Sequence, residues 1–228
     1  MMETAYTPPL GFAALTPLYD RVVRMMTREA AWRPRLVERI DARAGDIVLD
    51  VGSGTGSLAI AVTATAPDCR FMGVDPDPAA VALAGQKAAR AGSSATFEQG
   101  SFGGPATHDA GAVDKITCSL VLHQVPLAEK RRLLRAMFER LRPGGELLIA
   151  DYGLQPTFIM RLAFRLTVQM LDGRNDTQPN ADGILPLLIE EAGFEGMTLL
   201  DSFDTATGRI DIMRAEKPRA AHSKEQER

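Results

Sequence analysis

The sequence predicts a doubly wound α/β fold built on a mostly parallel, seven-stranded sheet. Between residues 46 and 151, short apolar runs alternate with helical patterns, which is typical of parallel strands joined by crossover helices. The chain has 228 residues, 45% hydrophobic and 24% charged, and this composition suits one globular domain with a sizeable core. A glycine-rich turn, GSGTG at 52–56, directly follows the first apolar run.

Each predicted strand is a short apolar run bounded by glycine, proline or polar residues. The helix over 78–91 begins at Pro78, which a first helical turn tolerates, and it ends before Gly92, a favourable C-cap. The residue pattern over 12–40 predicts one or two helices before the first strand of the sheet. The predicted strands are 46–51, 69–75, 95–99, 113–122, 146–151 and two closing strands near 197–201 and 208–214; the helices are 57–66, 78–91, 127–141, 157–171 and one through 185–193.

Three regions are expected along the chain. Residues 1–40 form a helical N-terminal lid segment, and residues 41–216 form the α/β domain. An insert at 153–183 interrupts this domain and supplies a second part of the lid. The polar residues 217–228 form a flexible tail.

Charge and cysteine usage narrow the class of protein. A formal net charge of −3 gives no general basic footprint for nucleic acid. Cys69 and Cys118 lie in apolar runs without metal-ligand spacing, so we expect buried thiols, no metal site and a reducing compartment. The N-terminus lacks the pattern of a signal peptide, and no apolar run approaches the roughly 20 residues of a membrane span. A cytoplasmic protein is expected, with peripheral membrane contact left open.

The stretch LDVGSGTGSLAIAV, residues 49–62, places three glycines at alternate positions between a strand and a helix. Glycine at this density allows close approach to the backbone, and a helix N-terminus attracts negative or polar ligand groups. A dinucleotide site expects GxGxxG or GxGxxA, whereas this run reads GxGxG with Ser57 at the sixth place. The run therefore favours a ligand site over a plain turn, and the spacing weighs against a dinucleotide.

The phrase VLDVGSGTG resembles the first motif of class I S-adenosylmethionine (SAM)-dependent methyltransferases, and GVDPDPAAVALA resembles their second. The stretches CSLVLHQVP and LRAMFERLRPGGELLIAD are similar to motifs of the ubiquinone and menaquinone C-methyltransferase group. The resemblance covers roughly residues 40–152. It implies a Rossmann-like SAM fold that closes with a reversed strand pair, SAM as the cofactor, and a small-molecule acceptor.

The resemblance also implies roles for the residues around the glycine turn. Asp75, at the end of the second strand, would accept hydrogen bonds from both ribose hydroxyls, although it can also act as a helix N-cap. Asp50 would lie beside the methionine end of SAM or brace the turn. Many relatives carry an acid after the third strand to meet the adenine, where EQGSF offers Ser101 and Phe102. The predicted cofactor-binding residues are Asp50, Gly52, Ser53, Gly54, Gly56, Asp75, Pro76, Ser101, Phe102 and Ser119.

Methyl transfer from a sulfonium is an in-line displacement, so it requires no nucleophilic side chain. Alignment alone can supply roughly 7 to 11 kcal/mol. His123, at the end of the fourth strand, is the best candidate for a base because its ordinary pKa suits proton transfer. The alternative is a structural histidine of this motif.

Three further residues are candidates for contact with the acceptor. Asp151 and Tyr152 follow the fifth strand and would face the same crevice, where either can orient the acceptor, although Asp151 can also cap a turn. Tyr19 resembles an N-terminal tyrosine that relatives bring over the active site, with core packing as the alternative. The catalytic candidates are thus His123, Tyr19, Asp151 and Tyr152.

The apolar helix over 157–171 is the feature that can separate substrates. With residues 12–30 it forms a lid for a planar or lipid-like acceptor, or it is a core-packed helix or a dimer face. By composition, 172–183 is a loop. We expect a monomer or homodimer that methylates a small, hydrophobic or aromatic molecule. The alternatives are a SAM-fold enzyme with other chemistry and a non-catalytic SAM-binding subunit.

Overall fold

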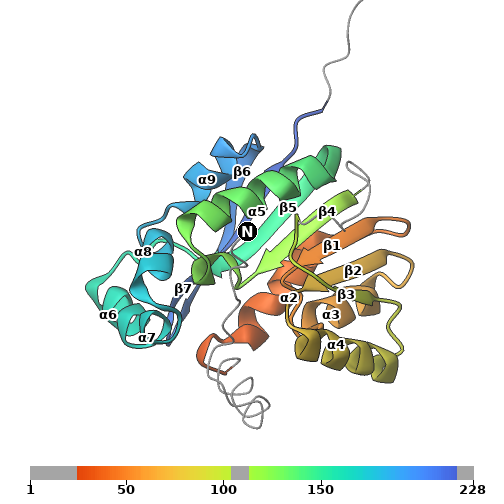
Figure 1. Ribbon diagram of the computed structural model, residues 1–228, viewed down its shortest axis with the longest axis horizontal. Coiled ribbons are helices and arrows are strands. Elements are labelled where there is room, and N and C mark those ends of the chain that lie inside the picture. Colours follow the sequence, from red (N-terminus) through yellow and green to blue (C-terminus); the bar gives the residue numbers. More distant parts are fainter. Residues whose placement is uncertain (1–24, 104–112, 220–228) are drawn as a thin grey trace, which may run out of the picture.

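A computed structural model describes residues 25–103 and 113–219 of the chain (Figure 1). Seven strands form one sheet in the order β3-β2-β1-β4-β5-β7-β6. The predicted α/β class and the strand number are confirmed. The strands are β1 Ile47–Val51, β2 Arg70–Asp75, β3 Thr96–Gln99, β4 Val113–Ser119, β5 Leu141–Tyr152, β6 Glu195–Thr205 and β7 Gly208–Glu216.

Strand direction decides where a ligand can enter. The first five strands are mutually parallel, while β7 runs antiparallel to both β5 and β6. The closing reversed pair predicted by resemblance is therefore present. The strand order reverses between β1 and β4, so the crevice beyond their carboxyl ends is the expected ligand site of an open α/β sheet.

Helices cover both faces of the sheet and produce two separate cores. One core joins β1, β4 and β5 to α5 and α9, and α5 lies in front of the sheet beside β5 in Figure 1. The other core joins the opposite sheet face to α2, α3 and α6. The helices are α2 Glu29–Ile40, α3 Ser57–Thr65, α4 Pro78–Ala91, the 3₁₀ turn η2 Leu122–Gln124, α5 Leu127–Arg140, α6 Phe158–Leu166, α7 Val168–Asp172, α8 Arg174–Ala181 and α9 Leu185–Glu191.

The strand predicted over 113–122 ends earlier, at Ser119. Leu120 has φ +55°, a left-handed conformation that a strand cannot contain. The turn η2 follows at Leu122–Gln124, and the Asp151 carboxylate accepts the backbone N–H groups of residues 121–123. A polar side chain from the neighbouring strand thus replaces the sheet hydrogen bonds at this point.

The prediction for the insert is partly wrong. The helix expected over 157–171 divides at Thr167, whose hydroxyl donates to the Ala163 carbonyl at 2.7 Å, so α6 ends and α7 begins there. The loop expected over 172–183 contains the helix α8. Partners outside the segment hold it: the Asn180 amide donates to the Tyr152 carbonyl at 3.0 Å. The two ends of the insert are joined by a hydrogen bond in which the backbone N–H of Gln155 donates to the carbonyl of Ala181 at 3.0 Å.

Two further predictions can be compared with the structure. Cys69 and Cys118 are buried free thiols, as predicted. Among the helices of the described ranges, none has the length and apolarity needed to cross a membrane. Residues 1–24 and 220–228 lie outside the described ranges, and with them most of the expected N-terminal lid and of the tail.

Candidate cofactor and acceptor site

The glycine turn joins β1 to α3 at the edge where the strand order reverses. Gly52, Gly54 and Gly56 all have positive φ, at 72°, 51° and 72°. A Cβ at Gly52 would lie 2.3 Å from Val121 Cγ2, and one at Gly56 would lie 2.7 Å from the Phe97 ring. No atom lies within 4 Å of a Cβ built at Gly54. Two of the glycines are therefore required by packing, while the middle one borders open space suited to a ligand.

Two side chains explain how the turn is held. The Ser53 side chain is buried and packs toward Gly73 of β2, and its backbone N–H donates to the Val74 carbonyl at 3.1 Å, so this serine fixes the turn to β2. From α4, the Lys87 ammonium donates to Thr55 Oγ1 at 3.0 Å and to Ser57 Oγ at 2.7 Å. The serine at the sixth place of the motif thus links α3 to α4. Sequence reasoning missed Lys87 because helical patterning marks it as an ordinary surface lysine.

Asp75 ends β2 beside the glycine turn. Its carboxylate accepts the Gly54 N–H at 2.8 Å and the Asp77 N–H at 2.9 Å. Burial raises the pKa of Asp75 above its ordinary value, and these two hydrogen bonds act in the opposite direction. The N-cap of α4 is Asp77, which accepts the Ala79 N–H at 2.8 Å. The N-cap alternative for Asp75 is therefore wrong, and its carboxylate faces the turn.

Asp50 precedes the turn inside the sheet and is 1% exposed. It accepts a hydrogen bond from Thr117 Oγ1 of β4 at 2.7 Å. Burial raises its pKa to about 7, against the opposing effects of the Thr117 hydrogen bond and the charge of Arg33 on α2. At neutral pH a carboxyl group with this pKa is only partly ionised, and a nearby cation such as a ligand ammonium would favour its charged form.

The remaining residues predicted to bind the cofactor surround this edge. Pro76 and Ser101 are exposed, and Ser119 is half-buried at the end of β4. Phe102 instead belongs to the core on the α5 face, where it packs in the same cluster as Val74.

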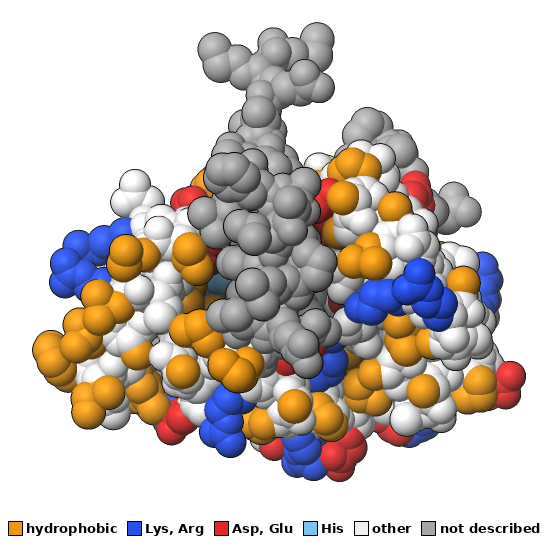
Figure 2. All heavy atoms as spheres, turned by 90° about the horizontal axis from the view of Figure 1, so that it is seen from below, with side chains coloured by type: hydrophobic (Ala, Val, Ile, Leu, Met, Phe, Trp, Pro, Cys, Tyr) orange, Lys and Arg blue, Asp and Glu red, His pale blue; other side chains and the backbone are white. Residues whose placement is uncertain are grey.

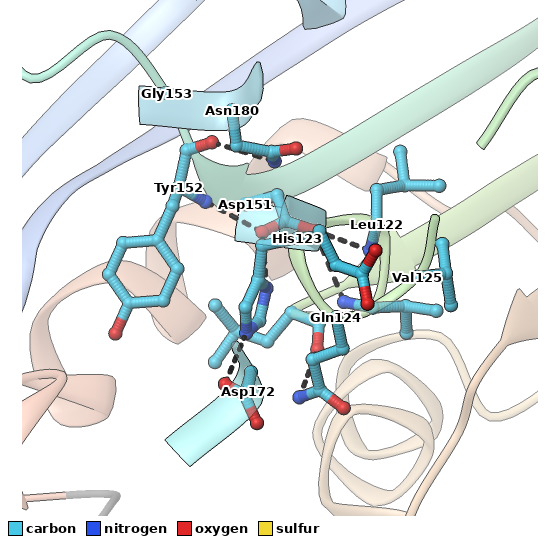
Figure 3. Close-up of polar contacts among 12 residues, drawn as sticks. Leu122, His123, Gln124, Val125, Asp151, Tyr152, Gly153, Asp172 and Asn180 are labelled. Atoms are coloured by element: carbon cyan, nitrogen blue, oxygen red, sulfur yellow. Dashed lines mark hydrogen bonds and ion pairs between the residues drawn. The ribbon is translucent and has the colours of Figure 1, made fainter. Parts of the chain in front are cut away.

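His123 lies in η2 and is clamped by two carboxylates (Figure 3). Its Nδ1 is 2.7 Å from Asp151 Oδ1, and its Nε2 is 3.6 Å from Asp172 Oδ2 of α7. Burial alone lowers the pKa of His123, but Asp151 and Asp172 outweigh that effect and raise it to about 9. The ring is therefore a protonated imidazolium at neutral pH. This protonation favours a structural role for His123 over the role of a general base.

Asp151 and Tyr152 are both buried in the protein. Asp151 is 0% exposed and, besides His123, accepts four backbone N–H groups, those of residues 121–123 and 152. Tyr152 stacks edge-on against His123 with ring centroids 4.9 Å apart, and its hydroxyl pairs with Thr207 Oγ1 at 2.6 Å. Asp151 thus caps the turn at η2, which is the alternative role that the sequence allowed for it. Tyr152 packs against the ring of His123 and thereby fixes the position of that ring.

Two further residues of this cluster were absent from the predicted site. Lys130 of α5 is 0% exposed and donates to the carbonyls of Leu122, Val125 and Asp176. Burial lowers the pKa of Lys130 to about 8. Together with Asp172 at His123, Lys130 ties α7 and α8 to the turn beside the cofactor crevice. Tyr19, the remaining candidate, lies outside the described residues.

Comparisons with known proteins agree with this geometry. The methyltransferase-domain family matches residues 48–145. Demethylmenaquinone methyltransferase of Thermus thermophilus is 28% identical over 160 residues, covering 69% of this chain and 71% of the relative. The Deinococcus radiodurans protein of the same name is 31% identical, with 69% and 65% covered. The chain carries a class I SAM-dependent methyltransferase domain. This assignment confirms the predicted reaction class and the predicted cofactor.

A solved structure shares the fold of this methyltransferase. Phosphoethanolamine N-methyltransferase 2 of Haemonchus contortus, in complex with phosphomonomethylethanolamine and S-adenosylhomocysteine, matches with a TM-score of 0.65. The two sequences are 14% identical, and the match covers 82% of this chain and 52% of the other. At this identity the likeness extends to the fold alone.

The clamp on His123 gives the methyltransferase a pH-dependent stability. Because its pKa in the folded state lies above the ordinary 6.5, His123 stabilises the fold fully below pH 6.5 and loses that contribution as the pH rises through about 9. We expect His123→Gln to be less stable than wild type by on the order of 1–3 kcal/mol at pH 6, with the gap closing by about pH 10. Urea unfolding of both proteins across this range measures the gap, and parallel curves would contradict the clamp.

Proposed function

We propose that this methyltransferase transfers the methyl group of SAM to a small, apolar acceptor that carries an aromatic or quinol ring. The observation that carries the cofactor half is Gly54, which borders open space while its N–H bonds Asp75. The ring-bearing acceptor is supported by the relatives, whose names describe the methylation of demethylmenaquinone.

The residues present suit SAM. The carboxylate of Asp75 would hold the ribose, the glycine turn would border the methionine part, and Asp50 would face its ammonium group. When bound, SAM supplies an electrophilic methyl group, and the chain's contribution is alignment and exclusion of water. Asp151 fixes the 121–123 backbone through three N–H groups, so one wall of the crevice is rigid.

The protonation of His123 restricts the kind of acceptor. An imidazolium between two carboxylates does not accept a proton at neutral pH. A phenol or a quinol, whose ring stabilises the deprotonated form, therefore fits this site better than an acceptor that needs a strong base. We also propose that the acceptor is a free small molecule rather than nucleic acid, and that the protein acts in the cytoplasm as a monomer or homodimer.

Transfer of a labelled methyl group tests this function. The protein is incubated with methyl-labelled SAM and, separately, a demethylated naphthoquinol, a simple phenol and a primary amine. We expect label in the ring-bearing acceptors, little in the amine, and none with Asp75→Ala at a SAM concentration limiting for that variant. Label in the amine alone would overturn the acceptor class. Tight SAM binding without label in any acceptor would favour a non-catalytic SAM-binding subunit.

A further inference from the structure

The helices α6 and α7 turn large apolar side chains away from the protein. Phe158 is 80% exposed, Ile159 77% and Met170 74%. In Figure 2 hydrophobic side chains gather over a protruding corner of the molecule on the left of the view, where Figure 1 places these helices. We call this surface the apolar corner; its residues are Phe158, Ile159, Leu162, Leu166, Met170 and Leu171.

The spacing of these residues makes the apolar corner one continuous stripe. Phe158, Leu162 and Leu166 are four residues apart and share a side of α6, with Ile159 beside them. Phe164, on the opposite side of the helix, is 1% exposed and anchors α6 to the core. A helix that only packed on the core would bury its apolar stripe. Here a second stripe faces outward, and a contiguous exposed patch of this kind marks an interaction surface.

The charges beside the apolar corner indicate an anionic partner. α6 contains two arginines, Arg161 and Arg165, and no acidic residue. Both line a hollow of about 130 Å³ to which α8 adds Arg174, with Asp182 as its acidic member. A second copy of this chain docked with the two-fold axis through α6 would bring the same arginines face to face. Charge complementarity therefore favours an anionic surface over a homodimer.

We propose that the apolar corner attaches the protein to an anionic lipid surface. The stripe enters the boundary between headgroups and acyl chains, while Arg161 and Arg165 at its edge meet the lipid phosphates. Both helices are too short to span a bilayer, so they lie in the plane of the interface. This attachment depends on α6 and α7 alone and is independent of which acceptor the enzyme methylates.

Co-sedimentation of the full-length protein with lipid vesicles tests the attachment. One set of vesicles contains equal parts of phosphatidylglycerol and phosphatidylcholine, and the other contains phosphatidylcholine alone. We expect wild type to sediment with the anionic vesicles, and less so as salt is added. The double variant Phe158→Ser/Ile159→Ser should bind them at least tenfold more weakly. Arg161→Gln/Arg165→Gln should lose the preference for anionic vesicles.

Control variants separate the outcomes. Leu199→Ser removes an equally apolar side chain, 54% exposed on β6, and should bind vesicles like wild type. Wild type that stays in the supernatant, or a Phe158→Ser/Ile159→Ser variant that binds unchanged, would overturn the proposal. So would a wild-type dimer that this variant makes monomeric, because a second copy then covers the corner. A fall in Tm well beyond about 2 °C would assign the corner to packing within the chain.

Discussion

Asp75→Ala lowers the affinity for SAM by on the order of 10- to 100-fold, the effect of losing hydrogen bonds to a charged group. The carboxylate lies at the end of β2 and already orients the Gly54 N–H at 2.8 Å. The variant therefore removes both the proposed acceptor of the ribose hydroxyls and the group that orients the middle of the glycine turn. Isothermal titration calorimetry with SAM measures the change.

A neighbouring aspartate supplies the matched control for this prediction. Asp77 lies two residues further on, and its side chain caps α4. Asp77→Ala should cost about 1 kcal/mol of stability, as the loss of an N-cap does, while SAM affinity stays near that of wild type. Equal losses of affinity in both variants, or none in Asp75→Ala, would move the cofactor away from the end of β2.

Lys130→Met destabilises the protein by about 3 kcal/mol, because three buried carbonyl groups lose their donor together. Those carbonyls belong to Leu122, Val125 and Asp176, so η2, the loop after it and α8 all loosen. At this chain length the change corresponds to a fall in Tm of about 6–12 °C. Differential scanning calorimetry at neutral pH, where Lys130 with its pKa of about 8 is mostly charged, measures it.

The next residue on α5 provides a comparison of matched chemistry. Arg131 forms an ion pair with Glu191 at 2.9 Å, and both side chains are 39% exposed. Arg131→Met should change stability by no more than about 0.5 kcal/mol, since exposed pairs contribute little. A similar small effect in Lys130→Met would show that water replaces the lysine and that α8 is held by its other contacts.

The cofactor half of the fold was predictable from the sequence because its signals are local. Glycine spacing, apolar runs and the capping residues around 78–92 are properties of neighbouring residues, and they produced the correct strands and helices. The GSGTG turn and Asp75 could be selected as candidates for the same reason. Gly52 and Gly56 are constrained by contacts with Val121 and Phe97, which are distant in sequence. Only the three-dimensional structure therefore distinguishes these two glycines from Gly54.

The acceptor half depends on partners that are distant in sequence. Helix α8 has a polar composition with Pro179 inside it, and contacts from Lys130 and Asn180 stabilise it rather than its own pattern. Lys130 lies on a helix rich in charged residues, and its burial depends on carbonyl groups outside that helix. The role of His123 changed for the same reason, because Asp172, 49 positions away in a segment predicted as loop, faces its second nitrogen.

The hydrogen bond from Gln155 to Ala181 joins the two ends of the insert that carries α6, α7 and α8. Because the two ends of this insert lie side by side, the residues between the ends can be replaced without a change in the spacing of the flanking strands. A segment exchanged in this way would leave the earlier part of the chain unchanged in sequence, but it would have to supply new partners for Lys130 and His123.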